Sequence, residues 1–232
     1  DETKNLSIGL EPENTHPIIL SHLRNRVADS AIRDVTGILS EMRMIKSTEE
    51  IDDMRRAGRV AVAMCDAAAD SIAEGVPEYE IALAGIAAGT RRAAALLEGH
   101  SAGSLHSPVI HNLQILQSGP ELAMVHRRPT MRRLTKGDPV YMCFCPFTLF
   151  QQIKLGFDRE CFVGRVSDEH ARIYEIALQA QAAALNTIRP GVKAEDVHFA
   201  ALNVYRTNGF GICYRTGRGI GYSFLESPEF KD

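Results

Sequence analysis

Residues 117–138 read QSGPELAMVHRRPTMRRLTKGD, and this stretch decides how the rest of the sequence is interpreted. Gly119 and Gly137 mark turns near its two ends, and His126 stands between them. Residues 111–117 before it and 140–145 after it are rich in apolar residues that favour strands. We therefore expect a connection between two strands that carries one imidazole.

Two helices are predicted ahead of this stretch. Ser47-Thr48-Glu49-Glu50 fits a capping box, which predicts a helix from there to the Gly75-Val76-Pro77 breaker. An alanine-rich helix is expected over Glu78–Leu97. Apolar residues at spacings of three and four predict the buried stripe of the first helix. Its expected members are Ile51, Met54, Gly58, Val62, Cys65, Ala69 and Ile72.

The pattern then repeats loosely. Residues 150–163 have the β-branched and aromatic content of strands. Helices are predicted over Asp168–Ile188, before Arg189-Pro190-Gly191, and over Ala194–Thr207, before Asn208-Gly209. A helix pair followed by strands therefore occurs twice. This order predicts an α+β fold with helices on one face of a mostly antiparallel sheet.

The first 45 residues differ from the rest. A short strand over Asn5–Leu10 and a short helix over His16–Val27 are expected there. Such a segment buries too little apolar surface to fold well alone. We predict that residues 1–40 are the C-terminal remnant of a preceding domain. Residues 41–232 are expected to form one catalytic domain, incomplete at its C-terminus.

Composition excludes several classes of protein. A net charge of −3 over 232 residues gives no general attraction to nucleic acid or to membrane phosphates. No apolar run approaches the roughly 20 residues that cross a bilayer. Five cysteines without a Cys-x-x-Cys pair argue against a disulfide framework. We expect a cytoplasmic protein that binds neither nucleic acid nor membranes.

Four segments carry a family resemblance. They are Arg43–Glu50, the stretch 117–138, Phe157-Asp158-Arg159 up to Gly164, and Ile188–Gly191 with Tyr214–Gly221. In order and spacing they resemble the superfamily of creatinase, prolidase, aminopeptidase P and methionine aminopeptidase. The resemblance spans about residues 40–230. It implies a pita-bread fold, with two pseudo-repeated αβ halves around a curved sheet, and it implies a homodimer.

The resemblance also shows where this sequence departs from the peptidases. Those relatives hold two metal ions with two Asp, one His and two Glu. Cys143 and Gly156 stand at the positions of the two Asp, and Arg218 stands at the position of the His. Arg218 is a fixed cation and cannot bind a metal ion. We therefore predict no metal site and no other cofactor.

Two residues are the candidates for catalysis. His126 matches the acid–base histidine of creatinase, and an imidazole with a pKa near neutrality suits proton transfer. Asp158 is expected to face the same side of its strand as Gly156, because side chains alternate along a strand. The alternatives are a surface histidine after a turn and a simple ion pair between Asp158 and Arg159.

Three residues are the candidates for substrate binding. Arg218, in its glycine-rich turn, could bind a carboxylate with two parallel hydrogen bonds. Glu226 matches a glutamate of the family, although Leu225 replaces the histidine before it. Arg127 belongs to an arginine run that could attract an anionic substrate or simply form a solvated loop. Cys143 is either a nucleophile or a small buried apolar residue.

The leading hypothesis is a creatinase-like hydrolase that needs no metal. Its small-molecule substrate would carry a carboxylate and an amidine, guanidino or cyclic amidine group, as creatine and ectoine do. Two alternatives remain open at this point. One is a pita-bread binding module without catalysis, for which His126 has no evident use. The other is a metal-dependent Xaa-Pro peptidase, against which Cys143, Gly156 and Arg218 speak.

Overall fold

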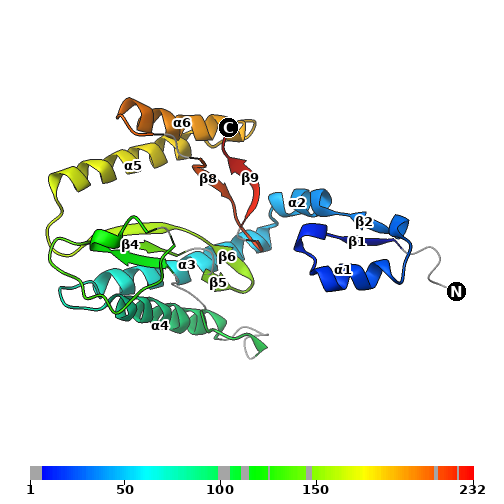
Figure 1. The fold of residues 1–232 in the computed structure, drawn as a ribbon, viewed down its shortest axis with the longest axis horizontal. Helices are drawn as coiled ribbons and strands as arrows, with labels where there is room; N and C mark the ends of the chain where they lie inside the picture. The colour runs from blue at the N-terminus through cyan, green and yellow to red at the C-terminus, as the bar shows by residue number, and fades with distance from the viewer. Residues whose placement is uncertain are drawn as a thin grey trace. The chain divides into compact units, whose positions relative to one another are not determined.

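The computed structural model describes residues 7–98, 105–110, 115–124, 126–144, 148–211, 214–223 and 225–232. The chain separates into two compact units, Asp1–Lys46 and Ser47–Asp232 (Figure 1). None of the described helices is both long and apolar enough to cross a membrane.

The first unit is small. Strands β1 (Ile8–Leu10) and β2 (Ile32–Asp34) pair in parallel, and helices α1 (Pro17–Arg24) and α2 (Thr36–Met44) accompany them. The predicted helix over His16–Val27 is therefore present but shorter. No described residue of this unit is fully buried. The unit thus lacks a core of its own among the described residues, and its origin as the remnant of a preceding domain stays a prediction.

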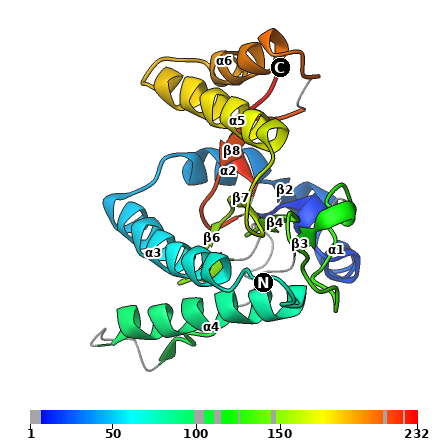
Figure 2. The same cartoon turned by 90° about the vertical axis from the view of Figure 1, so that its left-hand side faces the viewer.

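The second unit begins with a long helix pair. Helix α3 (Thr48–Asp70) starts at the predicted capping box, in which the Glu50 amide donates to Ser47 Oγ at 3.2 Å and the Ser47 amide donates to Glu50 Oε2 at 2.7 Å. Helix α4 (Glu78–Leu97) has the predicted bounds. The two helices pack side by side (Figure 2).

The predicted stripe of α3 is confirmed only in part: Met54, Cys65 and Ile72 pack against the core, but the fully buried residues are others. The buried residues are Ala57, Val60, Ala61, Met64 and Ala68, whereas Val62 is 58% exposed. The reason is close helix packing. A Cβ added at Gly85 of α4 would lie 3.3 Å from the Met64 carbonyl oxygen and 3.6 Å from the Ala68 Cβ. Alanine and glycine therefore form the closest contact between the two helices, while Val60 and Met64 of α3 are buried in the core beside it.

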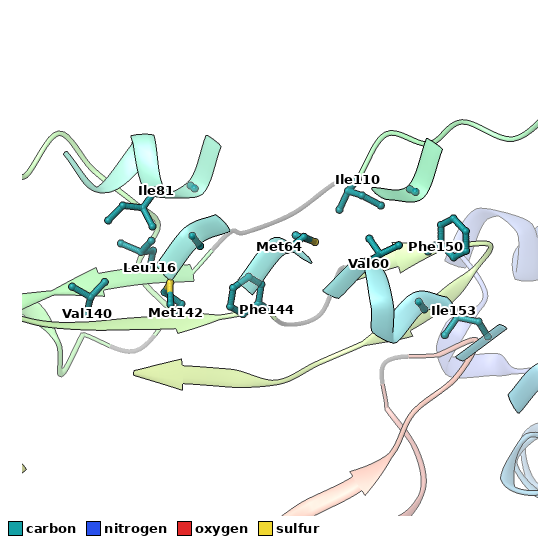
Figure 3. Packing of buried hydrophobic residues seen from close by; sticks show 14 of the residues in the cluster. Val60, Met64, Ile81, Ile110, Leu116, Val140, Met142, Phe144, Phe150 and Ile153 are labelled. Carbon is teal, nitrogen blue, oxygen red and sulfur yellow. The ribbon is translucent and has the colours of Figure 1, made fainter. Parts of the chain in front are cut away.

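A three-stranded antiparallel sheet packs against this helix pair. Its order is β3 (Ile115–Ser118), β4 (Pro139–Cys143) and β7 (Asp158–Phe162). Val140, Met142 and Leu116 point from the sheet into the core with Met64 and Ile81 (Figure 3). Because side chains alternate along a strand, Tyr141 and Cys143 lie on the opposite face.

The segment 150–163, predicted as continuous strand, is divided. A hairpin of β5 (Thr148–Phe150) and β6 (Ile153–Leu155) precedes β7. Its two-residue turn is Gln151-Gln152, with φ of 49° and 69°. Tight hairpin turns need positive φ at both central residues and usually carry Gly or Asn there, so glutamines gave no turn signal.

The second helix pair is followed by another two-stranded sheet. Helices α5 (Asp168–Thr187) and α6 (Ala194–Thr207) end before the predicted breakers, and strands β8 (Gly217–Gly219) and β9 (Glu226–Phe230) pair antiparallel. The Lys154 amide donates to the Gly221 carbonyl at 2.7 Å, which connects β6 to this half. The helix-pair-then-strands order occurs twice, which confirms the α+β class.

One buried carboxylate joins α4 to the sheet and to the loop of residues 119–133. Glu78, the first residue of α4, has no solvent exposure and accepts five hydrogen bonds. Arg127 donates two of them, at 2.6 and 2.8 Å, and Thr130 donates two, at 2.7 and 2.8 Å. Ser118 of β3 donates the fifth at 2.6 Å.

The electrostatics of this carboxylate follow from its partners. Burial raises the pKa of Glu78, but the hydrogen bonds from Arg127, Ser118 and Thr130 outweigh it and lower the pKa to about 2. Next to it, Arg132 donates to Asp138 Oδ2 at 2.7 Å. Burial raises the pKa of Asp138 as well, and the bonds from Arg132 and Thr135 reverse that effect and lower it.

The helix contact predicts opposite effects for two glycines. A Cβ at Gly89 of α4 would collide with Met64 Cγ and lie 2.9 Å from its Sδ, whereas nothing lies within 4 Å of one at Gly58 of α3. Gly89→Ala should lower the free energy of unfolding by about 1–3 kcal/mol, since overpacking outweighs helix propensity. Gly58→Ala should raise it by up to about 1 kcal/mol. Urea unfolding of both variants checks the contrast, and equal effects would contradict the packing described.

The lowered pKa of Glu78 predicts a specific acid sensitivity. A carboxyl whose folded pKa lies below its unfolded value stabilises the fold above the unfolded value, about 4.5, and loses that contribution as pH falls toward about 2. The free energy of unfolding should therefore fall between pH 5 and pH 3 less steeply in Glu78→Gln than in the wild type. Urea unfolding across that range measures the slope. Glu80→Gln, an exposed neighbour on α4, should keep the wild-type slope.

Candidate active site

The polar face of the three-stranded sheet brings three of its residues together. Cys143 of β4 lies directly opposite Asp158 of β7, and Tyr141 lies opposite Glu160. Cys143 is 4% exposed, while Asp158 is exposed. Gly156 and Phe157 lie between β6 and β7, so the strand alternation used to place Asp158 does not extend to Gly156, although both residues line the same cleft. Cys143, the neighbour of Asp158, stands where the peptidases carry their first metal ligand.

Tyr141 is hydrogen-bonded to this pair. Burial raises its pKa most, and the Asp158 carboxylate and the Cys143 thiol raise it further. The phenol therefore stays protonated at neutral pH and can donate to Asp158. Burial also raises the pKa of Glu160, which the nearby His170 partly offsets.

A cleft of about 790 Å³ opens beside Asp158. Gly156, Asp158 and Arg159 line it from the region of β7, and Arg215 and Arg218 line it from the region of β8. Apolar and polar side chains of α5 and α6 complete the described wall, among them Tyr174, Leu178, Gln181, Leu185 and Tyr205. One carboxylate and several guanidinium groups thus line one cavity.

The contact between Asp158 and Arg159 differs from the simple side-chain ion pair given as the alternative. Arg159 Nη1 donates to the backbone carbonyl of Asp158 at 2.7 Å, and its guanidinium lies 5.1 Å from the centre of the Phe157 ring. Arg215 pairs with Glu229 at 3.0 Å. These cations are held by partners of their own, while the Asp158 side chain faces the cleft.

His126 lies outside this cleft. It is exposed on the loop of residues 119–133, and its φ of 61° places it in the left-handed region. The Leu116 amide donates to the carbonyl of the next residue, Arg127, at 3.2 Å. The loop is thus attached to β3 immediately after His126. The predicted catalytic role of His126 remains a prediction.

Arg127 has two carboxylate partners within the protein. Besides the bonds to Glu78, its Nε lies 3.2 Å from Glu121 Oε2. Its side chain is only 12% exposed. The predicted alternatives for Arg127 were substrate binding and a solvated loop. This geometry favours a third role, in which Arg127 pairs with carboxylates of the fold itself. Arg133 likewise donates to the Gly75 carbonyl at 2.8 Å.

Glu226 is buried at the start of β9. It is 6% exposed and accepts a hydrogen bond from the Ser223 amide at 2.8 Å. A Cβ on Gly221 would lie 2.8 Å from its Oε2, so a larger residue there would displace this carboxylate. It is not among the residues that line the cleft with Asp158 and Arg218. Its role in substrate binding stays a prediction.

The donor set does not fit the paired metal ions of the peptidases. Asp158 and Cys143 are the anionic or thiol groups near the ligand positions, whereas Gly156 has no donor and Arg218 is a cation. Within the ranges that the structure describes, no three His, Cys, Asp or Glu side chains converge to hold a metal ion. The described residues therefore provide no ligand set for a metal-dependent step.

Sequence reasoning missed Glu78 and Tyr141. Tyr141 could have been found, because it precedes Cys143 by two and therefore shares its face of the strand. Glu78 opens a helix whose preceding residue, Pro77, provides no side-chain cap. An acidic residue at the start of a helix is also favoured by the helix dipole, and this local explanation gives no indication of the long-range partners of Glu78.

Comparisons with known proteins agree with the fold. The chain is 31% identical to the agropine synthesis cyclase of Rhizobium rhizogenes, over 97% of this chain and 57% of that protein. It is 29% identical to the creatinase of Bacillus sp. (strain B-0618), over 94% of this chain and 50% of the relative. The prolidase structure from Pyrococcus horikoshii OT3 superimposes with a TM-score of 0.80 at 25% identity, covering 97% of this chain and 61% of that one.

These likenesses confirm the pita-bread superfamily. The chain spans half to three-fifths of the length of the curated relatives it matches, 50% and 57% for the two named. Residues 52–232 match metallopeptidase family M24, which is most of the chain. By this match and by its fold, the chain belongs to metallopeptidase family M24.

Proposed function

We propose that this chain is part of a creatinase-like hydrolase that cleaves a C–N bond outside peptides without a metal ion. The substrate is a small compound with a carboxylate and an amidine, guanidino or cyclic amidine group. Creatine and ectoine are the model compounds for this class. The family membership supports hydrolysis, and the residues at the former ligand positions support the change of substrate.

The observation that carries the proposal is the shared cleft of Asp158 and Arg218. A guanidinium binds a carboxylate with two parallel hydrogen bonds, and a carboxylate stabilises an amidinium cation. A small zwitterion presents both groups at once. The volume of about 790 Å³ lies in the usual range of small-molecule sites.

The named relatives support different substrates. Creatinase and an agropine synthesis cyclase are not peptidases by name, and they favour a small non-peptide substrate. The likeness to a prolidase favours a peptide. Arg218 weighs against the peptidase mechanism, because a fixed cation at a ligand position repels a metal ion. The small zwitterion is therefore preferred.

The proposed step is hydrolysis. The oxygen of water bonds to the amidine carbon, the C–N bond breaks, and the nitrogen leaves with a proton. His126 is assigned the transfer of that proton, from water to the leaving nitrogen, which requires its loop to bring the imidazole to the cleft that the described residues line without it. Asp158, hydrogen-bonded to Tyr141, stabilises the cationic carbon centre, and Arg218 orients the substrate carboxylate.

Substrate and metal dependence are tested together. The purified protein should hydrolyse creatine or ectoine, should not cleave Xaa-Pro dipeptides, and should keep its activity after dialysis against a strong chelator. Product amine is measured by mass spectrometry, and bound metal by elemental analysis. Dipeptide cleavage that is lost with the chelator and restored by Mn²⁺ or Co²⁺ would refute the proposal.

The roles predict separable kinetic effects. Arg218→Ala should raise KM about tenfold or more, because a hydrogen bond to a charged group contributes roughly 1.5–3 kcal/mol. His126→Ala should lower kcat by about 100-fold or more with little change in KM. Arg91→Ala, an exposed arginine of α4, is the matched control and should change neither. If the wild type binds the small molecule but does not turn it over, the result would favour a binding module instead.

A further inference from the structure

The residue after His126 is the most firmly held part of its loop. Arg127 donates to both carboxylate oxygens of Glu78, at 2.6 and 2.8 Å, and its own carbonyl accepts the Leu116 amide at 3.2 Å. Side chain and backbone of Arg127 are therefore fixed to two different elements, α4 and β3. The Cα of His126 is one peptide bond from this double attachment.

A second attachment lies three residues further on. The Thr130 hydroxyl and amide both donate to Glu78, and the Thr130 carbonyl accepts the Tyr79 amide at 3.3 Å. The Arg132 carbonyl accepts the Glu78 amide at 3.0 Å. The loop thus supplies the hydrogen-bond acceptors for the first turn of α4, whose N-cap Pro77 has no side-chain cap.

His126 itself adopts a backbone conformation that needs support. Its φ of 61° is rare for a residue other than glycine, and such conformations persist only where the surroundings enforce them. No hydrogen bond or ion pair of its imidazole is seen with the described part of the chain. Among the described contacts, the attachments of Arg127 therefore fix where the Cα of His126 lies and from which point its imidazole extends.

We propose that Glu78, acting through Arg127, is the positioning residue of His126. This inference rests on the proposed function, in which His126 transfers the proton. A buried ion pair is a poor source of stability, since an apolar pair of similar volume is often as stable. A bidentate pair does, however, fix distance and angle. Fixed geometry is what an acid–base group on an otherwise exposed loop requires.

The test compares Glu78→Gln with Glu80→Gln. The first replaces one carboxylate oxygen by an NH₂ group and weakens the bidentate pair, and the second changes an exposed carboxylate two residues away on the same turn of α4. Both are measured as the full chain with ¹³C-labelled histidine. In Glu78→Gln the ring signals of His126 should shift or broaden while those of His170 and His198 stay in place. Glu80→Gln should leave all of them unchanged.

Kinetics with creatine or ectoine provide the second measurement. Glu78→Gln should lower kcat by roughly 10- to 100-fold with KM nearly unchanged, because a small misplacement of a catalytic group costs that much. Unchanged His126 signals, or an unchanged kcat in a variant whose signals do shift, would overturn the positioning role.

If Glu78→Gln does not fold, Thr130→Ala serves as the second variant. It removes one hydroxyl donor to the same carboxylate and should cause smaller changes in the same direction. Its failure to move the His126 signals would again overturn the role. A wild-type protein that hydrolyses none of the compounds refutes the proposed function, while the histidine spectra still decide whether Glu78 fixes the position of His126.

Discussion

A carboxylate with no access to water organises the first half of the second unit, Ser47–Asp232. Glu78 would be costly to bury alone, and its five hydrogen bonds are what make the position tolerable. The donors come from β3 and from Arg127 and Thr130 of the loop of residues 119–133. Pairing the one charge of Glu78 therefore brings α4, β3 and this loop together. The helix pair, the sheet and the loop therefore form correctly as a set or leave a charge unpaired.

The same half shows how one sheet serves two purposes. Val140 and Met142 face the helices and fill the core, and Tyr141 and Cys143, which alternate with them, face the other way. A shift of register by one residue would bury the polar set and expose the apolar one. The apolar face thus fixes the place of Asp158, because Asp158 is paired with Cys143 across the strands.

The helices could be predicted because they follow from local periodicity and local end signals. The capping box at Ser47 and the bounds of α4 and α6 are local signals of this kind. Glu78 and Ser118 are 40 residues apart, and no local pattern reports such a contact. The buried face of α3 was predicted only in part, because close packing against the glycines of α4 buries alanines together with Val60 and Met64, so burial on α3 does not follow side-chain size.

The family name and the chemistry of the site lead in different directions, and electrostatics decides between them. A centre that holds two divalent cations needs several anionic ligands to balance them. Here one such position holds a glycine, another a largely buried cysteine, and a third an arginine, so the site has lost negative charge and gained a positive one. A cavity altered in this way attracts anions.

Because a fold can support many chemistries, the charge of the cleft is a better guide to the substrate than the family membership. We propose on this ground a small molecule whose carboxylate reaches Arg218 while its cationic end lies against Asp158.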